Sequence, residues 1–129
     1  MNELLRPEGL VHSPAFTHVA VVPPGATTVH IGGQNAVDGS GALVGTDAAR
    51  QTRQVMANLR DALASADATV HDLVMLTILL TTDADLGAAY PVAAAALDGA
   101  APPVVVTRVA GLAVPGALVE VAAVAAVVR

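Results

Sequence analysis

The apolar run Ala117–Val128 near the end of the sequence restricts the fold more than any other segment. We expect it to form a long strand, in which successive side chains point to opposite faces of a sheet. Its even positions and its odd positions are both apolar, apart from Glu120. A strand with one face in water would alternate between apolar and polar residues, so both faces of this strand are expected to be buried.

The composition agrees with a second buried face. Hydrophobic residues make up 54% of the 129 residues and charged residues only 13%, against about 25% charged residues in typical globular domains. Aromatic residues are 2% of the chain, so the core must be built from Ala, Val and Leu. The length fits one domain over residues 1–129 that can bury a core. Because so little charge cannot coat an isolated small domain, the chain is expected to bury one face against copies of itself.

The charged residues exclude several kinds of partner. The net charge is −5, and the six basic residues are all Arg, scattered along the chain. Nucleic-acid binding usually needs a basic stripe, often with stacking aromatics, so we expect no nucleic-acid partner. The chain has no Cys, and its four His residues show no metal-ligand spacing. We therefore expect no metal site.

No segment has the pattern of a membrane or export signal. Residues 1–7 carry charges and a Pro but lack the apolar core of a signal peptide. The longest apolar run is shorter than the ~20 residues that a membrane-spanning helix needs. The lack of Cys fits a reducing compartment. We expect no membrane partner and a cytoplasmic location.

Two segments have the pattern of helices. Residues 48–66 carry apolar side chains at a spacing of three and four, with Thr46 or Asp47 as the cap. Residues 85–97 are rich in Ala but contain Pro91. Either this second helix begins near Tyr90, with Pro91 in its first turn, or it is kinked.

The remaining apolar segments alternate with turns and read as strands. Gly32 and Gly33 are expected to close the second of these strands. The expected strands are residues 19–22, 28–31, 42–44, 73–80, 104–109 and 117–128. This order of elements predicts an α+β domain: a mixed six-stranded sheet with two helices on one face. The other face must then meet another subunit.

Glu120 is the most informative candidate for chemistry, because it interrupts a strand that is otherwise apolar on both faces. Carboxylates are rarely buried unless they are paired. Removal from water disfavours the charged form of a carboxyl group, which suits a general acid or base or a residue that holds a water. The alternatives are an ion pair with an Arg, or exposure where two subunits meet.

The segment Gly32-Gly33-Gln34-Asn35 follows a strand and is a second candidate. Two glycines allow close approach of the backbone, and their N–H groups could receive a ligand carboxylate or oxyanion. On this segment alone, a plain turn is the favoured interpretation. The dinucleotide-binding pattern of glycines and a downstream acid is missing.

Three blocks of the sequence resemble the Rid family, the reactive intermediate deaminases also called YjgF or RidA. The blocks are IGGQNAVDGSGALVG at residues 31–45, QTRQVMANLRDALASADATVHDLVMLTILLT at 51–81 and VAGLAVPGALVEVAAVA at 109–125. They occur in the order and with the spacing of the family, and together they cover most of the domain.

The resemblance implies a chorismate-mutase-like α+β fold. It also implies a homotrimer whose sheets form a trimeric barrel, with a cleft at each subunit interface. Better-known members hydrolyse the enamine and imine products of amino-acid dehydratases and release ammonia, without a metal or an organic cofactor. Their cleft uses an Arg that binds the substrate carboxylate, a Glu that positions water, and backbone groups near a Ser-Gly-Gln segment.

Part of this cleft matches residue by residue. Glu120 matches the family's Glu, and its expected role is to position water for hydrolysis. Gly33 and Gln34 match the Gly-Gln pair, whereas Gly32 occupies a position where Ser is common. We expect these three residues to contact the substrate.

The rest of the cleft departs from the family. Phe16 occupies a position where a Tyr often lines the cleft, and Tyr90 lies near a position often held by Asn. Val104 replaces the carboxylate-binding Arg and offers no donor. Arg108 is expected on the same face of the strand, but four residues correspond to about 13 Å. Arg108 of a neighbouring subunit therefore remains an open replacement.

Three functions stay open at this point. The favoured one is a homotrimer that binds a small, less acidic metabolite and hydrolyses it with Glu120 positioning water. The second is a non-catalytic binding or scaffold protein of the same fold. The third is an ordinary 2-imino acid deaminase of the 2-iminobutanoate or 2-iminopropanoate type, with an unusual carboxylate site. A ribonuclease is the least favoured, given the acidic charge.

Overall fold

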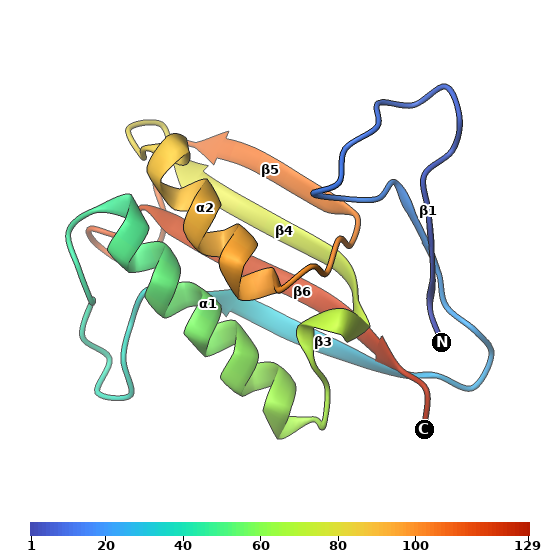
Figure 1. Cartoon of the computed structure of the whole chain (residues 1–129). Helices are drawn as coiled ribbons and strands as arrows, with labels where there is room; N and C mark the ends of the chain where they lie inside the picture. Colours follow the sequence, from blue (N-terminus) through green and yellow to red (C-terminus); the bar gives the residue numbers. More distant parts are fainter.

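The computed structural model describes residues 1–129 and is drawn in Figure 1. One four-stranded sheet carries both α-helices on a single face, and a small two-stranded sheet lies beside it. The elements are β1 (Glu3–Leu5), β2 (Val19–Val21), β3 (Thr27–Gln34), α1 (Ala48–Ser65), a 3₁₀ turn (Val70–Asp72), β4 (Leu73–Thr81), α2 (Leu86–Leu97), β5 (Val104–Val109) and β6 (Val119–Val127).

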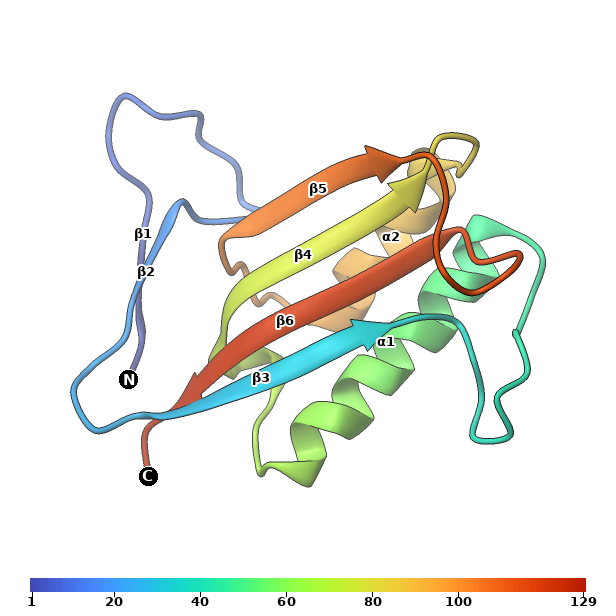
Figure 2. The ribbon, with the colours of Figure 1, turned by 180° about the vertical axis from the view of Figure 1, so that it is seen from behind.

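The main sheet is mixed. Its strand order is β3-β6-β4-β5, in which β4 and β5 run parallel and the other neighbours run antiparallel. The view from behind shows the opposite face without a covering helix (Figure 2). The predicted α+β fold with two helices on one face of a mixed sheet is therefore confirmed.

The six strands do not join one sheet, and this differs from the prediction. Strand β2 pairs with β1, a strand that the sequence analysis did not include, and both stay apart from the main sheet. Residues 42–44 form no strand, because their only pairing is the isolated bridge from Val37 to Leu43. Pro23 and Pro24 follow β2 and lack the backbone N–H that sheet pairing needs, which ends this strand early.

Both helices begin at an Asp cap. The Asp47 carboxylate accepts a hydrogen bond from the Arg50 backbone N–H at 2.8 Å, so Asp47 rather than Thr46 caps α1. The Asp85 carboxylate accepts from the Ala88 backbone N–H at 3.2 Å. Helix α2 consequently begins at Leu86, not near Tyr90, and Pro91 lies inside it. This proline leaves one intrahelical bond unmade, a cost that the cap and the Ala-rich sequence offset.

The core lies between the helices and one face of the sheet. Four residues of β6 that face the helices are at most 5% exposed, and they pack with apolar residues of α1. This core set comprises Val119, Val121, Ala123, Ala125, Val55, Met56, Leu59 and Leu63. On the other face of β6, Glu120, Ala122 and Val124 remain half-buried. Neither helix is both long and apolar enough to cross a membrane. The single chain thus covers only one face of its central strand.

Candidate functional site

Glu120 lies on the uncovered face of the sheet, where β6 pairs with β4. Its neighbour across the strands is Leu79. The carboxylate also lies against Gly33 of β3: a Cβ at Gly33 would come within 2.6 Å of Glu120 Oε2. The predicted Glu and the predicted Gly of the cleft therefore meet in one chain.

A β-bulge creates this close approach. In the β3–β6 register Ile31 pairs with Ala123 and Gln34 pairs with Val121, so Gly32 and Gly33 together lie opposite one residue. The strand continues through both glycines to Gln34 instead of closing at Gly32, as the sequence analysis expected. Gln34 folds back, its Nε2 donating to the carbonyl oxygen of Gly32 at 3.1 Å. Glycine suits such a bulge because the backbone and a neighbouring side chain approach closely there.

No Arg neutralises Glu120 within the chain. The two ion pairs join His71 to Asp98 and Arg129 to Asp67, both at the surface. The half-buried carboxylate also forms no hydrogen bond inside the chain. An ion pair within the chain is therefore excluded, and Glu120 can still bind water, a ligand or a neighbouring subunit.

Three other predicted site residues line one pocket on the helix side of the sheet. Phe16, Tyr90 and Val104 surround a cavity of about 430 Å³ between α2, β5 and the loop before β2. Tyr90 extends from α2 and is 54% exposed. This volume is within the roughly 300–1,000 Å³ of typical small-molecule sites.

The pocket and Glu120 lie on opposite faces of the sheet. Val104 pairs with Leu76, whereas Glu120 pairs with Leu79, three residues further along the regular strand β4. Successive residues of a strand point to opposite faces, so an odd separation places the two side chains on different sides. One chain therefore contains two half-sites: the Glu120 group with Gly33, and the Val104 pocket with Phe16 and Tyr90.

Arg108 does not line the Val104 pocket. It shares the face of Val104, as predicted, because it pairs with Leu80 while Val104 pairs with Leu76. However, its Nη1 donates to the carbonyl oxygens of Thr81 at 3.2 Å and Ala84 at 3.0 Å. Arg108 thus stabilises the connection between β4 and α2.

A polar network from α1, which the sequence analysis did not identify, fixes the Glu120 group. Gln51 is fully buried; its Nε2 donates to the carbonyl oxygens of Gly45 and Gly116 at 3.2 and 3.0 Å, and its Oε1 accepts from the Leu118 backbone N–H at 2.8 Å. Leu118 lies two residues before Glu120. Polar residues within the apolar stripe of a helix are the signal that could have revealed this network.

Asn58, two helical turns after Gln51, holds the other strand. Its Nδ2 donates to the carbonyl oxygens of Asn35 and Val37 at 3.0 and 2.9 Å, directly after β3. Helix α1 therefore anchors the segments that flank both Gly33 and Glu120.

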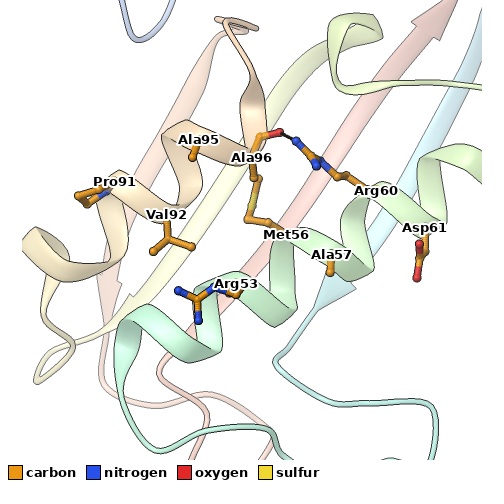
Figure 3. Close-up of a pocket in the computed structure, with 9 residues that line it drawn as sticks. All are labelled: Arg53, Met56, Ala57, Arg60, Asp61, Pro91, Val92, Ala95 and Ala96. Atoms are coloured by element: carbon orange, nitrogen blue, oxygen red, sulfur yellow. Dashed lines mark hydrogen bonds between the residues drawn. The ribbon is translucent and has the colours of Figure 1, made fainter.

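A separate groove lies between the outer sides of α1 and α2 (Figure 3). Arg60 at its edge donates to the carbonyl oxygen of Ala96, and Arg53 points toward Val92. None of the predicted site residues lines this groove. The half-sites described above are therefore the better candidates.

The fold and the half-sites define an α+β domain with an uncovered sheet face and a carboxylate beside a glycine bulge. Residues 11–127 match the family described as Endoribonuclease L-PSP, and the chain belongs to this family, the Rid or YjgF proteins. No curated protein matches the chain.

Solved structures of the family share this fold. A member of the conserved Rid family from Yersinia pestis, described as a protein of unknown function, is 32% identical with a TM-score of 0.85, covering 96% of this chain and 97% of that one. A YjgF/YER057c/UK114 family member from Mycobacterium tuberculosis is 26% identical with a TM-score of 0.63, covering 98% and 100%. RidA from an Antarctic Psychrobacter is 24% identical with a TM-score of 0.69, covering 89% and 96%.

Proposed function

We propose that this chain forms a homotrimer that binds a small metabolite in clefts between subunits and hydrolyses an imine or enamine there. The uncovered sheet face supports the assembly, because apolar residues such as Val124 and Leu79 are only half-buried in a single chain. A sheet face of this kind is stable in water when a second layer covers it.

The main support for a cleft shared between subunits is the separation of the two half-sites. The Glu120 group and the Val104 pocket lie on opposite faces of one sheet, so one chain cannot close them around a single ligand. A subunit boundary at which the Glu120 group of one subunit meets the Val104 pocket of the next completes the site. Tyr90 and Val106, two exposed apolar residues that line the pocket, support such a contact.

Hydrolysis needs a positioned water and a proton acceptor. Water adds to the imine carbon, Glu120 takes a proton from that water, and the imine nitrogen gains a proton. The carbon–nitrogen bond of the resulting carbinolamine then breaks. The balance is an imine plus water giving a ketone or aldehyde plus ammonia. A carboxylate without an Arg partner can exchange these protons and needs no cofactor.

Two measurements test the proposal. Light scattering of the purified chain should give the mass of three subunits, and a monomer would contradict the shared cleft. Ammonia release from imines generated in situ should exceed the uncatalysed rate and should fall at least about 100-fold in Glu120→Gln. Equal rates in the variant and the unchanged protein would remove Glu120 from the mechanism.

A binding protein without catalysis is the second candidate, and Val104 favours it. Without the carboxylate-binding Arg, the site loses the group that orients an imino acid. Saturable ligand binding without any ammonia release would support this candidate. For the same reason, a 2-imino acid deaminase is the least supported of the three.

A further inference from the structure

The Val104 pocket has no charged side chain in its lining. Eleven of its fifteen lining residues are hydrophobic, and none is Arg, Asp or Glu. A ligand carboxylate in such a pocket would lose its hydration without gaining an ion pair or a charge-assisted hydrogen bond.

Arg108 cannot supply the missing charge from within the chain. Its guanidinium group binds two backbone carbonyl oxygens, those of Thr81 and Ala84. It also lies four residues beyond Val104 on the same strand, about 13 Å along β5. Moving it into the pocket would break both hydrogen bonds.

The polar side chains in the lining are neutral. The Ser13 hydroxyl accepts from the Ala15 backbone N–H at 3.1 Å. The Tyr90 hydroxyl has no partner within the chain and can bind one neutral oxygen or nitrogen of a ligand. The pocket therefore offers a large apolar surface and a neutral hydrogen-bonding group.

We propose that the substrates are uncharged imines that carry a branched alkyl or single-ring group and no carboxylate. The products are then the matching ketones. This inference rests on the proposed function, because the apolar group occupies the Val104 pocket while the imine carbon faces Glu120 of the neighbouring subunit. It separates this chain from enzymes whose substrates are imino acids.

A matched pair of ligands tests the inference by binding. In 4-methyl-2-pentanone a methyl group replaces the carboxylate of 4-methyl-2-oxopentanoate, and the two are otherwise the same. Tyr90 lines the pocket and is the only tyrosine, and the chain has no tryptophan, so the intrinsic fluorescence of the assembled protein reports on this pocket. We expect the ketone to bind at least about tenfold tighter than the oxo acid. Equal or tighter binding of the oxo acid, or no binding of either ligand, would overturn the inference.

A charge introduced into the pocket should reverse the preference. In Val104→Arg the oxo acid should bind tighter than the ketone, whereas Val128→Arg adds the same charge at an exposed position outside the pocket and should leave the order unchanged. The same reversal in both variants would show that net charge, not the pocket, sets the preference. Thermal melting identifies a variant that fails to fold. In that case the relative affinity of the unchanged protein for the ketone and the oxo acid tests the inference alone.

Turnover separates this inference from the proposed function. Oxidation of 2-amino-4-methylpentane generates the uncharged imine, and oxidation of leucine generates the matching imino acid. Faster hydrolysis of the imino acid would overturn the substrate class while supporting hydrolysis. Preferential ketone binding with no hydrolysis of either imine would overturn hydrolysis while supporting the ligand class.

Discussion

Glu120 and Gly33 face each other so closely that a single methyl group on Gly33 would come within 2.6 Å of the Glu120 carboxylate. Neither Gly33 nor Gly32 has a positive φ angle, so backbone freedom does not explain a glycine at either position. A glycine at position 33 is explained instead by the space that the Glu120 carboxylate occupies. Position 32 is different, because a Cβ there would meet no atom within 4 Å.

This asymmetry predicts different effects for two alanine variants. Gly33→Ala should push the flexible end of Glu120 away from its position and lower imine hydrolysis about 10-fold to 100-fold, because a misplacement of 1 Å can cost that much. Gly32→Ala should lower hydrolysis by a smaller factor, because a Cβ at position 32 does not touch the Glu120 carboxylate. Ammonia release measures the effect, and thermal melting should show both variants folded. Similar losses in the two variants would contradict a specific role of Gly33.

Gln51 should contribute more to stability than a surface glutamine. In Gln51→Leu, the Leu118 N–H and two carbonyl oxygens lose their partner, and each buried unsatisfied group costs about 1–3 kcal/mol. We expect a loss of roughly 2–5 kcal/mol in the free energy of unfolding, measured with urea. Arg53→Leu on the same helix removes an exposed side chain and should change stability by about 0.5 kcal/mol or less. A near-neutral Gln51→Leu would mean that water replaces the amide.

The spacing of apolar residues and the positions of turn residues were enough to predict most of the fold. The apolar spacing in residues 48–66 matches α1, and the runs 73–80 and 104–109 match β4 and β5 within a residue. Strand pairing in the N-terminal part was wrong because β1 has only three residues, too few to show a pattern. The start of α2 was left open because Pro91 suggested a boundary that the Asp85 cap overrides.

The candidate site was only partly accessible from the sequence. Glu120 was distinctive as a lone carboxylate in an apolar strand, and the structure brings it to Gly33. That Phe16, Tyr90 and Val104 share a pocket depends on tertiary packing of segments far apart in the chain. Their position on the opposite face from Glu120 depends on the register of β4 with its two neighbours, which side-chain alternation within one strand cannot specify.

The loop after β3 should loosen in acid. Asp38 accepts hydrogen bonds from the Ser40 hydroxyl and from the backbone N–H groups of Ala42 and Ser40, and these bonds lower the pKa of its carboxyl group from its ordinary value. Because the folded-state pKa is depressed, the stabilisation is present above the ordinary pKa and is lost as the pH falls through the folded value. Amide exchange at Ala42, corrected for its intrinsic rate, should therefore accelerate in that range.

Asp38→Asn is the matched variant, since it keeps an acceptor oxygen but has no carboxyl group to protonate. Its corrected exchange at Ala42 should show no step with pH near the carboxyl pKa. A step of unchanged size in this variant would assign the transition to another group.

The uncovered sheet face should be the subunit contact, and a charge there should separate the subunits. Val124 lies on that face, opposite His30 on β3 and Met75 on β4, and is half-buried in the single chain. Val124→Asp would place an unpaired carboxylate in the interface, where desolvation is costly. We expect this variant to lose the trimer in light scattering and to lose ammonia release with it, because each cleft needs two subunits. Ala57→Asp adds the same charge on the exposed outer side of α1 and should remain trimeric. If Val124→Asp stayed trimeric and active, the subunits would have to meet through another surface, and the two half-sites could not be joined in the way proposed.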